Sequence, residues 1–419
     1  MSGQQQRGPV SSKRARLGRL DSFEWIMLAT MGLCAVVFIE PAPFDLLAVG
    51  LLPLALLLRR LAIPRGSAFA LVCVALFIVA NVLSLPAAKL LFVGARFFAI
   101  TAYLILAWAL VLGFVGKSGE RALQVLFAGW AIGATVTSVL AIGSYFGVLP
   151  FAARMAPQGR VHALFKDANV YGAYLVAPAV WAVAQLVSLE RGRRLPWTIV
   201  LVVCAMGVLL TYSRGAWISL ALGLAVFFGL RMVAFGSPRS RAMLLLMVPV
   251  AAVLLALALD RLASVDVVQT MLDQRLGLQR YDTDRFATQR EALEVATRTP
   301  LGIGPGQSES TFTRAAHNAY VRAFVENGYL GGLSLAALLF GSFFRSAWLA
   351  IDAEDVRVQT AMAVVAGSLA AICVESMVID SVHWRHTWIL AGMAWLPGLT
   401  RGGQRGQRAR GPTAALAPR

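Results

Sequence analysis

A histidine before an apolar stretch is the clearest candidate for catalysis in this 419-residue chain. His317 stands in His317-Asn318, directly ahead of the run that begins at Ala319. The positive end of a helix disfavours a charged imidazolium, so we expect a neutral ring at a boundary between water and apolar surroundings. Such a ring is suited to be a general base, and from its position alone a structural hydrogen bond explains it equally well.

Three arginines in separate polar segments have the chemistry to hold a phosphate, because a guanidinium fork binds two oxygens at once. They are Arg160, Arg214 and Arg285. Arg285 has no acid four residues later, whereas Arg290 has one, so Arg285 is the more available. Further polar residues that could contact a substrate are Lys166, Asp167, Asn169, Asn318, Arg290 and Arg154.

Metal and nucleotide sites are only weakly indicated. Asp282-Thr283-Asp284 has a D-x-D form that can hold a divalent cation, but acids at a helix N-terminus explain it better. The glycine-rich segment 301–306 lacks the G-x-G-x-x-G spacing and predicts a tight turn. We expect no metal and no cofactor. The cysteines lie in apolar runs without CxxC spacing and are interpreted as small buried residues: Cys34, Cys73, Cys204 and Cys373.

The elements that must position these residues are membrane helices. Hydrophobic residues make up 58% of the chain, charged residues 14%, and the mean hydropathy is +0.70. Soluble domains carry roughly 25% charged residues, and apolar runs near 20 residues are typical of spanning helices. The net charge of +17 would suggest nucleic acid in a soluble protein. Here many arginines follow apolar runs and no nucleic-acid motif is present, so we expect membrane lipids and no nucleic acid.

The positive-inside rule orients these runs. Every even-numbered span ends in a loop with Arg or Lys, which predicts about twelve spans with both chain ends in the cytoplasm. The fourth and twelfth are the weakest, because Arg96 interrupts the one and the other is short. The predicted spans are 24–40, 43–58, 67–84, 90–114, 123–146, 170–189, 196–212, 216–233, 243–259, 328–349, 358–379 and 386–400.

The predicted organisation is all-α. It consists of a basic cytoplasmic tail (1–21), nine spans (22–259), a large outer loop (260–316), three spans (317–400) and a second basic tail (401–419), without a cleavable signal peptide. In the loop, residues 284–298 predict a helix with Phe286, Leu293 and Ala296 on or near one face. Arginine and lysine residues on the outer side run against the positive-inside rule, so their presence there needs an explanation other than topology. All four histidines also fall on the outer side: His162, His317, His383 and His386.

Several motifs follow one another in a fixed order between about residues 155 and 335. They are Gly159-Arg160 through Phe165, Asp167 and Asn169; Ser213-Arg214-Gly215-Ala216; Asp284-Arg285; Thr299 to Gly306; His317-Asn318-Ala319-Tyr320; and Glu326-Asn327-Gly328 with Gly331. With this set and a large outer loop between spans 9 and 10, the chain resembles the O-antigen ligase/polymerase family of bacterial inner-membrane glycosyltransferases.

The resemblance implies a GT-C-like, metal-independent transferase that takes a glycan from undecaprenyl pyrophosphate on the periplasmic side. It implies that His317 deprotonates the acceptor hydroxyl, and it fits Arg160, Arg214 and Arg285 as pyrophosphate ligands with inversion at the anomeric carbon. We predict an O-antigen ligase with lipid A-core as acceptor.

Three alternatives remain. An O-antigen polymerase or a protein O-oligosaccharyltransferase would share this chemistry, and the large loop favours the ligase or the oligosaccharyltransferase. A polyprenyl-linked glycan transporter would need charges buried in mid-membrane, for which the sequence offers only Arg96 and Glu375 as candidates.

Overall fold

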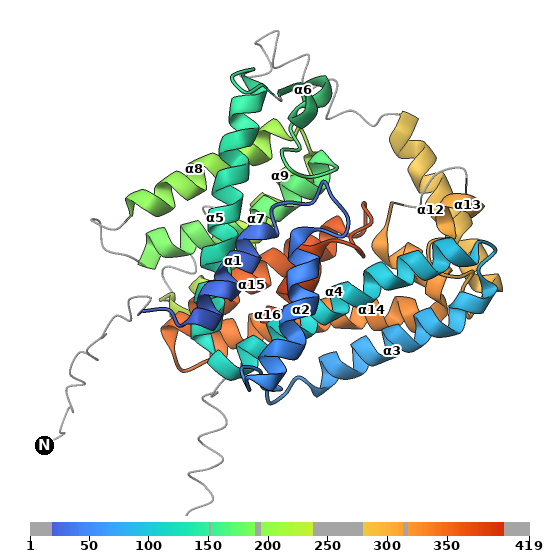
Figure 1. Ribbon diagram of the computed structural model, residues 1–419, viewed down its shortest axis with the longest axis horizontal. Helices are drawn as coiled ribbons and strands as arrows, with labels where there is room; N and C mark the ends of the chain where they lie inside the picture. The colour runs from blue at the N-terminus through green and yellow to red at the C-terminus, as the bar shows by residue number, and fades with distance from the viewer. Residues whose placement is uncertain (1–18, 151, 189–193, 238–279, 313–316, 398–419) are drawn as a thin grey trace, which may run out of the picture.

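A computed structural model describes residues 19–150, 152–188, 194–237, 280–312 and 317–397, and within these ranges every regular element is a helix (Figure 1). The all-α prediction is confirmed for this part of the chain. Seven of the described helices are long and apolar enough to cross a membrane. They are α3 (Ala68–Ser84, extended by the 3-10 turn η1, Leu85–Ala87), α4 (Leu91–Ser118), α5 (Glu120–Tyr145), α7 (Ala168–Ser188), α9 (Arg214–Phe235), α14 (Ala319–Asp352) and α15 (Val356–Glu375).

Four further predicted spans correspond to shorter helices. Helices α2 (Pro43–Leu57) and α8 (Leu195–Leu210) are apolar but have 15 and 16 residues. Helices α1 (Ser22–Leu33) and α16 (Arg385–Met393) have 12 and 9 residues. At 1.5 Å per residue the last two rise by roughly 18 and 14 Å, well short of a hydrocarbon core about 30 Å thick. The predicted span 243–259 lies outside the described residues, so the count of twelve stays a prediction.

Several predicted spans change in extent, the first and the fourth among them. The first reached residue 40, but α1 ends at Leu33, because the chain turns away and the N–H groups of Val37 and Phe38 donate to Leu164 O. The fourth, doubted because of Arg96, is one continuous helix of 28 residues, and Arg96 is an exposed residue in its second turn.

Four short elements and one amphipathic helix complete the described fold. The short elements are α6 (Ala152–Met155), η2 (Pro157–Gly159), α13 (Ser308–Thr311) and η1. Helix α12 (Arg280–Arg298) packs on α14 through Ala292 and Ala296, which share a small apolar cluster with Val325. The predicted position of Ala296 is therefore confirmed, whereas Leu293 is 47% exposed.

Helix α15 is the centre of the bundle. It packs against α5, α7, α9, α14 and α16, and 89% of the residues in its most apolar 18-residue stretch are buried. Small residues let its backbone touch that of α9, since a Cβ added to Gly367 would lie 2.4 Å from the carbonyl oxygen of Gly223. Such small-residue crossings are typical of helices that pack in membranes.

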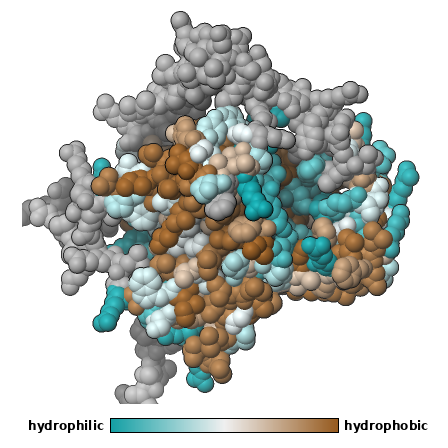
Figure 2. Space-filling model, turned by 45° about the horizontal axis from the view of Figure 1, so that its top comes forward, coloured by the Kyte–Doolittle hydropathy of each residue, from teal (hydrophilic) through white to brown (hydrophobic). Residues whose placement is uncertain are grey.

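Large apolar side chains also cover much of the outer surface. Leu57 is 80% exposed and Phe92 is 84% exposed, and apolar residues occupy broad areas of the face in Figure 2. A soluble monomer rarely exposes an apolar patch of more than a few hundred Å². The outer faces of the helices therefore fit a lipid environment.

The loops of the bundle sort into two groups that make contacts among themselves. At the basic end, Arg60 pairs with Asp21 at 2.7 Å, and Ala62 N–H donates to Gly113 O. The other end is called here the histidine end. It contains the segments 34–42, 85–90, 146–150, 152–167, 211–213, 299–312, 317–318 and 376–384. This grouping agrees with the predicted direction of the spans, because loops predicted to be cytoplasmic contact one another, and so do loops predicted to be on the outer side.

Candidate active site

Arg160 lies against the C-terminal end of α8. Its Nε donates to Thr211 O at 3.1 Å and its Nη2 donates to the side-chain oxygen of Asn169 at 3.0 Å. The next residue, Val161, donates its N–H to Leu210 O at 3.0 Å. Asp167 accepts from Asn169 N–H at 2.6 Å at the start of α7. Asp167 and Asn169, predicted as substrate contacts, thus help to fix the direction of the Arg160 fork.

Arg214 is the first residue of α9, and only Thr211, Tyr212 and Ser213 separate it from α8. Ser213 caps α9 by accepting from Ala216 N–H at 3.3 Å, and Tyr212 makes the turn with φ +51°. Since Arg160 is bonded to Thr211, the structure brings the segments of these two arginines together.

A buried carboxylate joins the start of α9 to the end of α15. Glu375 is 3% exposed and accepts from Ser219 Oγ at 2.7 Å. A Cβ added to Gly215 would lie 3.0 Å from its Oε1, so a larger residue beside Arg214 would press on this carboxylate. Glu375, a candidate for a charge in mid-membrane, is the last residue of α15.

His317 lies directly before the N-terminus of α14, as predicted. Asn318 caps this helix by accepting from the N–H groups of Tyr320 and Val321 at 3.0 Å each, and its amide donates to Met377 O at 2.8 Å. Ala319 N–H donates to Ser376 O at 2.8 Å. His317 itself has φ +45°, which is uncommon for a residue other than glycine and occurs where neighbouring contacts impose it.

These contacts place three of the four predicted site segments around one point, the C-terminal end of α15. Residues 318–319 bond to Ser376 and Met377, while Gly215 contacts Glu375 and Arg160 is bonded to the α8–α9 turn. The fourth, Arg285, belongs to α12, but its side chain lies outside what the structure describes. Two of the other predicted contacts, Arg154 on α6 and Arg290 on α12, are exposed.

Lys166 points to a different group from Arg160. Its Nζ lies 2.5 Å from Glu40 Oε2 in the segment after α1. Glu40 also lies 3.9 Å from Arg385 Nη2, and Arg385 pairs with Asp45 of α2 through two bonds of 2.5 and 2.8 Å. Asp45 is 1% exposed, so this pair is buried. Sequence reasoning missed it because the two residues are 340 positions apart.

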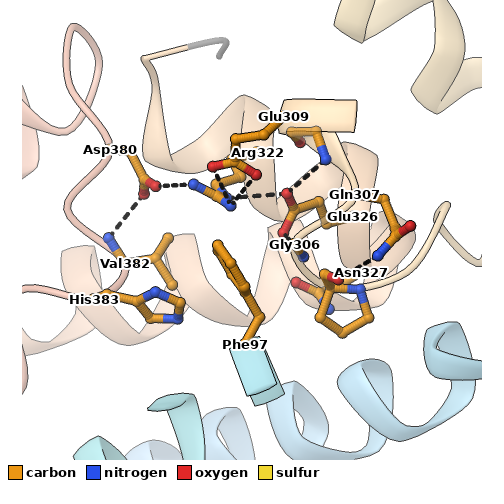
Figure 3. A network of polar contacts seen from close by, with 12 residues as sticks. Phe97, Gly306, Gln307, Glu309, Arg322, Glu326, Asn327, Asp380, Val382 and His383 are labelled. Atoms are coloured by element: carbon orange, nitrogen blue, oxygen red, sulfur yellow. Dashed lines mark hydrogen bonds and ion pairs between the residues drawn. The ribbon is translucent and has the colours of Figure 1, made fainter. Parts of the chain in front are cut away.

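A second ionic cluster, also unforeseen, surrounds Arg322 (Figure 3). Its guanidinium contacts Asp380, Glu309 at 3.0 Å and Glu326 at 3.1 Å, and it lies over the ring of Phe97 at 4.8 Å. The Arg322 and Glu326 side chains are 10% and 5% exposed. The one signal in the sequence was the four-residue spacing of Arg322 and Glu326 on a helix.

The Arg322 cluster ties the glycine-rich segment to α14. Glu326 accepts from Gly306 N–H at 2.7 Å and from Ser308 N–H at 3.1 Å. Gly328, with φ +67°, interrupts α14, and the freed carbonyls of Val325 and Glu326 accept from Ile303 and Gly304. The segment is therefore a tight turn, as predicted, and it docks on the break in α14.

Asp380 and His383 complete this region from the segment after α15. Burial is the largest single effect on Asp380 and raises the pKa of this carboxyl, but the positive charge of Arg322 and the hydrogen bonds that the carboxylate accepts together outweigh it, so the pKa is lowered. Burial lowers the pKa of His383 to about 4, so its ring is neutral near pH 7. His383 Nε2 lies 3.0 Å from Thr101 Oγ1 on α4.

Among the side chains that the structure describes, no group of three or more His, Cys, Asp or Glu residues is arranged to hold a metal ion. The side chains of Asp282 and Asp284 do not belong to this set. The four cysteines are buried and unbridged, which agrees with their interpretation as apolar residues.

The fold and the site define a helical, multi-pass membrane protein with a polar, arginine-containing site at one end of its bundle. A family model described as O-antigen ligase matches residues 199–336, a range that holds Arg214, α12 and His317. This match, across about a third of the chain, supports an O-antigen ligase family member and confirms the resemblance seen in the sequence. The family supports an enzyme of the O-antigen ligase or polymerase type. No curated protein matches the chain.

Proposed function

We propose that this protein is an O-antigen ligase, which transfers O-antigen from undecaprenyl pyrophosphate to lipid A-core. It acts at the periplasmic leaflet of the inner membrane, with the histidine end in the periplasm and both chain ends in the cytoplasm. The observation that carries the proposal is the gathering of the Arg160, Arg214 and His317 segments around the end of α15.

The arginines would stabilise the leaving group. Two negative charges develop on the pyrophosphate as the glycosidic bond breaks, and guanidinium groups can hold them through paired hydrogen bonds. Arg160 is oriented by Thr211 and Asn169, so its direction is set before substrate binds. Arg214 and Arg285 would complete the set. The chemistry at this site then needs no metal.

His317 would act as the general base. Its ring takes the proton of an acceptor hydroxyl, the freed oxygen attacks the anomeric carbon, and the bond from that carbon to the pyrophosphate oxygen breaks. One direct displacement inverts the configuration. The bonds of Asn318 and Ala319 to the end of α15 hold the histidine backbone toward the arginine segments. This preorganisation is what a base needs in order to act on a bound hydroxyl.

The rivals differ in acceptor or in the absence of chemistry. An O-antigen polymerase would use a second lipid-linked repeat, and a protein O-oligosaccharyltransferase would use a protein hydroxyl. One observation favours a transporter, because α14 is interrupted at Gly328 beside the buried Arg322 and Glu326. These charges pair with each other at the histidine end, however, and the interruption is occupied by the turn at 301–306, so they favour a rigid site.

Genetic complementation tests the proposal. The gene is deleted from a bacterium with smooth lipopolysaccharide and replaced by wild type or by His317→Ala. We expect the deletion to give rough lipopolysaccharide and full-length lipid-linked polymer, and only wild type to restore the smooth form. Single repeats on the core would identify a polymerase instead. Full activity of His317→Ala would contradict the role of the base.

A further inference from the structure

A cavity of about 140 Å³ lies at the histidine end, beside the arginine site but separate from it. It is enclosed by the segment after α1, the start of α7 and the segment leading into α16. Its apolar lining, called here the apolar wall, consists of Cys34, Val37, Phe165 and Val170. The polar residues of its lining include Glu40, Lys166, His383 and Arg385. The cavity therefore offers an apolar face and a hydrogen-bonding face to one small ligand.

The charges around this cavity are balanced. Lys166 pairs with Glu40 at 2.5 Å, and Arg385 is held by Asp45 through two bonds. His383 adds no charge near pH 7, because burial lowers its pKa to about 4. A phosphate would have to break one of these pairs and leave a carboxylate without its cation, and the cost is high for the buried Asp45 and smaller for the more exposed Glu40. An uncharged ligand meets no such cost.

The cavity is also next to the chemistry. Phe165, Lys166 and Val170 line it, while Asp167 and Asn169 of the same short segment hold Arg160. A ligand in the cavity would thus lie one chain segment away from the proposed pyrophosphate position.

We infer that the cavity binds a single uncharged sugar ring of one of the two glycans. The inference rests on the proposed function for the identity of the glycan. The C–H face of a sugar ring packs on the apolar wall, while its hydroxyls donate to Glu40 and accept from Lys166. Both kinds of partner are present, so no hydroxyl needs to be buried without a hydrogen bond. Because the ring can come from the acceptor core or from the donor, the test separates the two.

A cavity-filling variant provides the main test. Val170→Phe on α7 places a ring in the apolar wall without changing any charge. Val187→Phe is the matched control, since Val187 is on the same helix and 52% exposed. With purified full-length protein in nanodiscs, we expect Val170→Phe to raise the KM of one substrate at least tenfold and to keep kcat within about threefold. The substrate affected identifies the source of the ring. Unchanged KM values for both, in a variant that folds, would overturn the inference.

Direct binding separates this inference from the transferase function. Phosphate-free core oligosaccharide and phosphate-free O-antigen are titrated against the His317→Ala protein, in which no turnover is needed, with saturation-transfer NMR as readout. We expect one of them to bind, and Val170→Phe to weaken it at least fivefold. A second variant, Glu40→Gln, leaves Lys166 unpaired and should weaken the neutral sugar while favouring inorganic phosphate. Failure of both sugars to bind, or displacement of the bound sugar by phosphate in wild type, would refute a neutral sugar site.

Discussion

Glu326 is the residue through which the Arg322 cluster holds the glycine-rich segment, so Glu326→Gln should loosen the site. The carboxylate accepts from Gly306 N–H, from Ser308 N–H and from Arg322 Nε, and its side chain is 5% exposed. A glutamine keeps the shape but offers one oxygen instead of two. Its NH2 group would face a backbone N–H that needs an acceptor, and the charge opposite Arg322 would be lost.

The size of the effect follows from these contacts. Removing one partner of a buried ion pair costs about 3–5 kcal/mol. Arg322 keeps its contacts with Asp380 and Glu309, so we expect the lower end of that range, about 3 kcal/mol. Glu309 contacts the same guanidinium but its side chain is 48% exposed. Glu309→Gln should therefore cost about 1 kcal/mol or less.

The assay is the apparent midpoint of thermal unfolding of the full-length protein in detergent. In a chain of this length, 1 kcal/mol corresponds to about 2 °C or less, so Glu326→Gln should lower the midpoint by roughly 3–6 °C. Glu309→Gln should shift it by no more than about 2 °C. Equal shifts in the two variants would refute the reasoning, because the difference in burial is the reason for the difference in cost.

Four further predictions concern the site, the fold, acid stability and metal independence. Arg160→Lys keeps the charge but loses the guanidinium fork and the bond to Asn169, so the initial rate of glycan transfer should fall about 10- to 100-fold. The control Arg65→Lys, at an exposed arginine of the basic end, should transfer at the wild-type rate. Equal rates in the two variants would contradict the argument from the fork. Gly328→Ala should reduce the yield of folded protein, because Gly328 has φ +67° and an added Cβ would lie 2.2 Å from Pro300 O. Gly229→Ala should not reduce the yield, because a Cβ there meets open space. Size-exclusion profiles of the two variants compare their yields of folded protein. The pKa of Asp380 is lowered in the folded protein, so its ion pair stabilises the fold above the ordinary carboxyl pKa of 3.8, and this stabilisation is lost as the pH falls through the lower, folded value. The unfolding midpoint of wild type should therefore drop more steeply below pH 4 than that of Asp380→Asn. Parallel curves for the two proteins would argue against this role of Asp380. Transfer should persist in a chelator of divalent cations, and its loss would revive the Asp282-Thr283-Asp284 metal site.

Much of the fold could be predicted because it depends on local patterns. Apolar runs and flanking arginines located the described long helices to within a few residues at most of their ends, and the histidine before an apolar run marked the start of α14. The extents of α1 and α16 could not be predicted from the same patterns. Beyond these helices the chain continues as loops that contain buried apolar residues, such as Val37 after α1 and Leu396 after α16. An apolar composition does not distinguish burial in protein from burial in lipid.

The site could be predicted only where its residues lie in recognisable motifs. Arg160, Arg214 and His317 were proposed as site residues in this way, and tertiary contacts bring their segments together. The Arg322 cluster and the Arg385–Asp45 pair were missed, because their partners come from segments far apart in sequence. A charged residue near an apolar run indicates that burying it without a partner would cost free energy, but the sequence does not identify the partner, which is set by three-dimensional packing.

The buried charges at the histidine end also bear on the choice between transfer and transport. An alternating transporter needs elements that can separate, whereas the Arg322 cluster links the 301–308 turn, the first half of α14 and the segment after α15. Opening this region would separate a guanidinium from its carboxylates with little water present, at a cost of several kcal/mol. A transferase would gain from that same rigidity, because the proposed base His317 lies five residues before Arg322 and would have to keep its place relative to the arginine segments while the sugar bond breaks. The cluster is therefore better suited to hold a catalytic geometry than to allow an alternation of access.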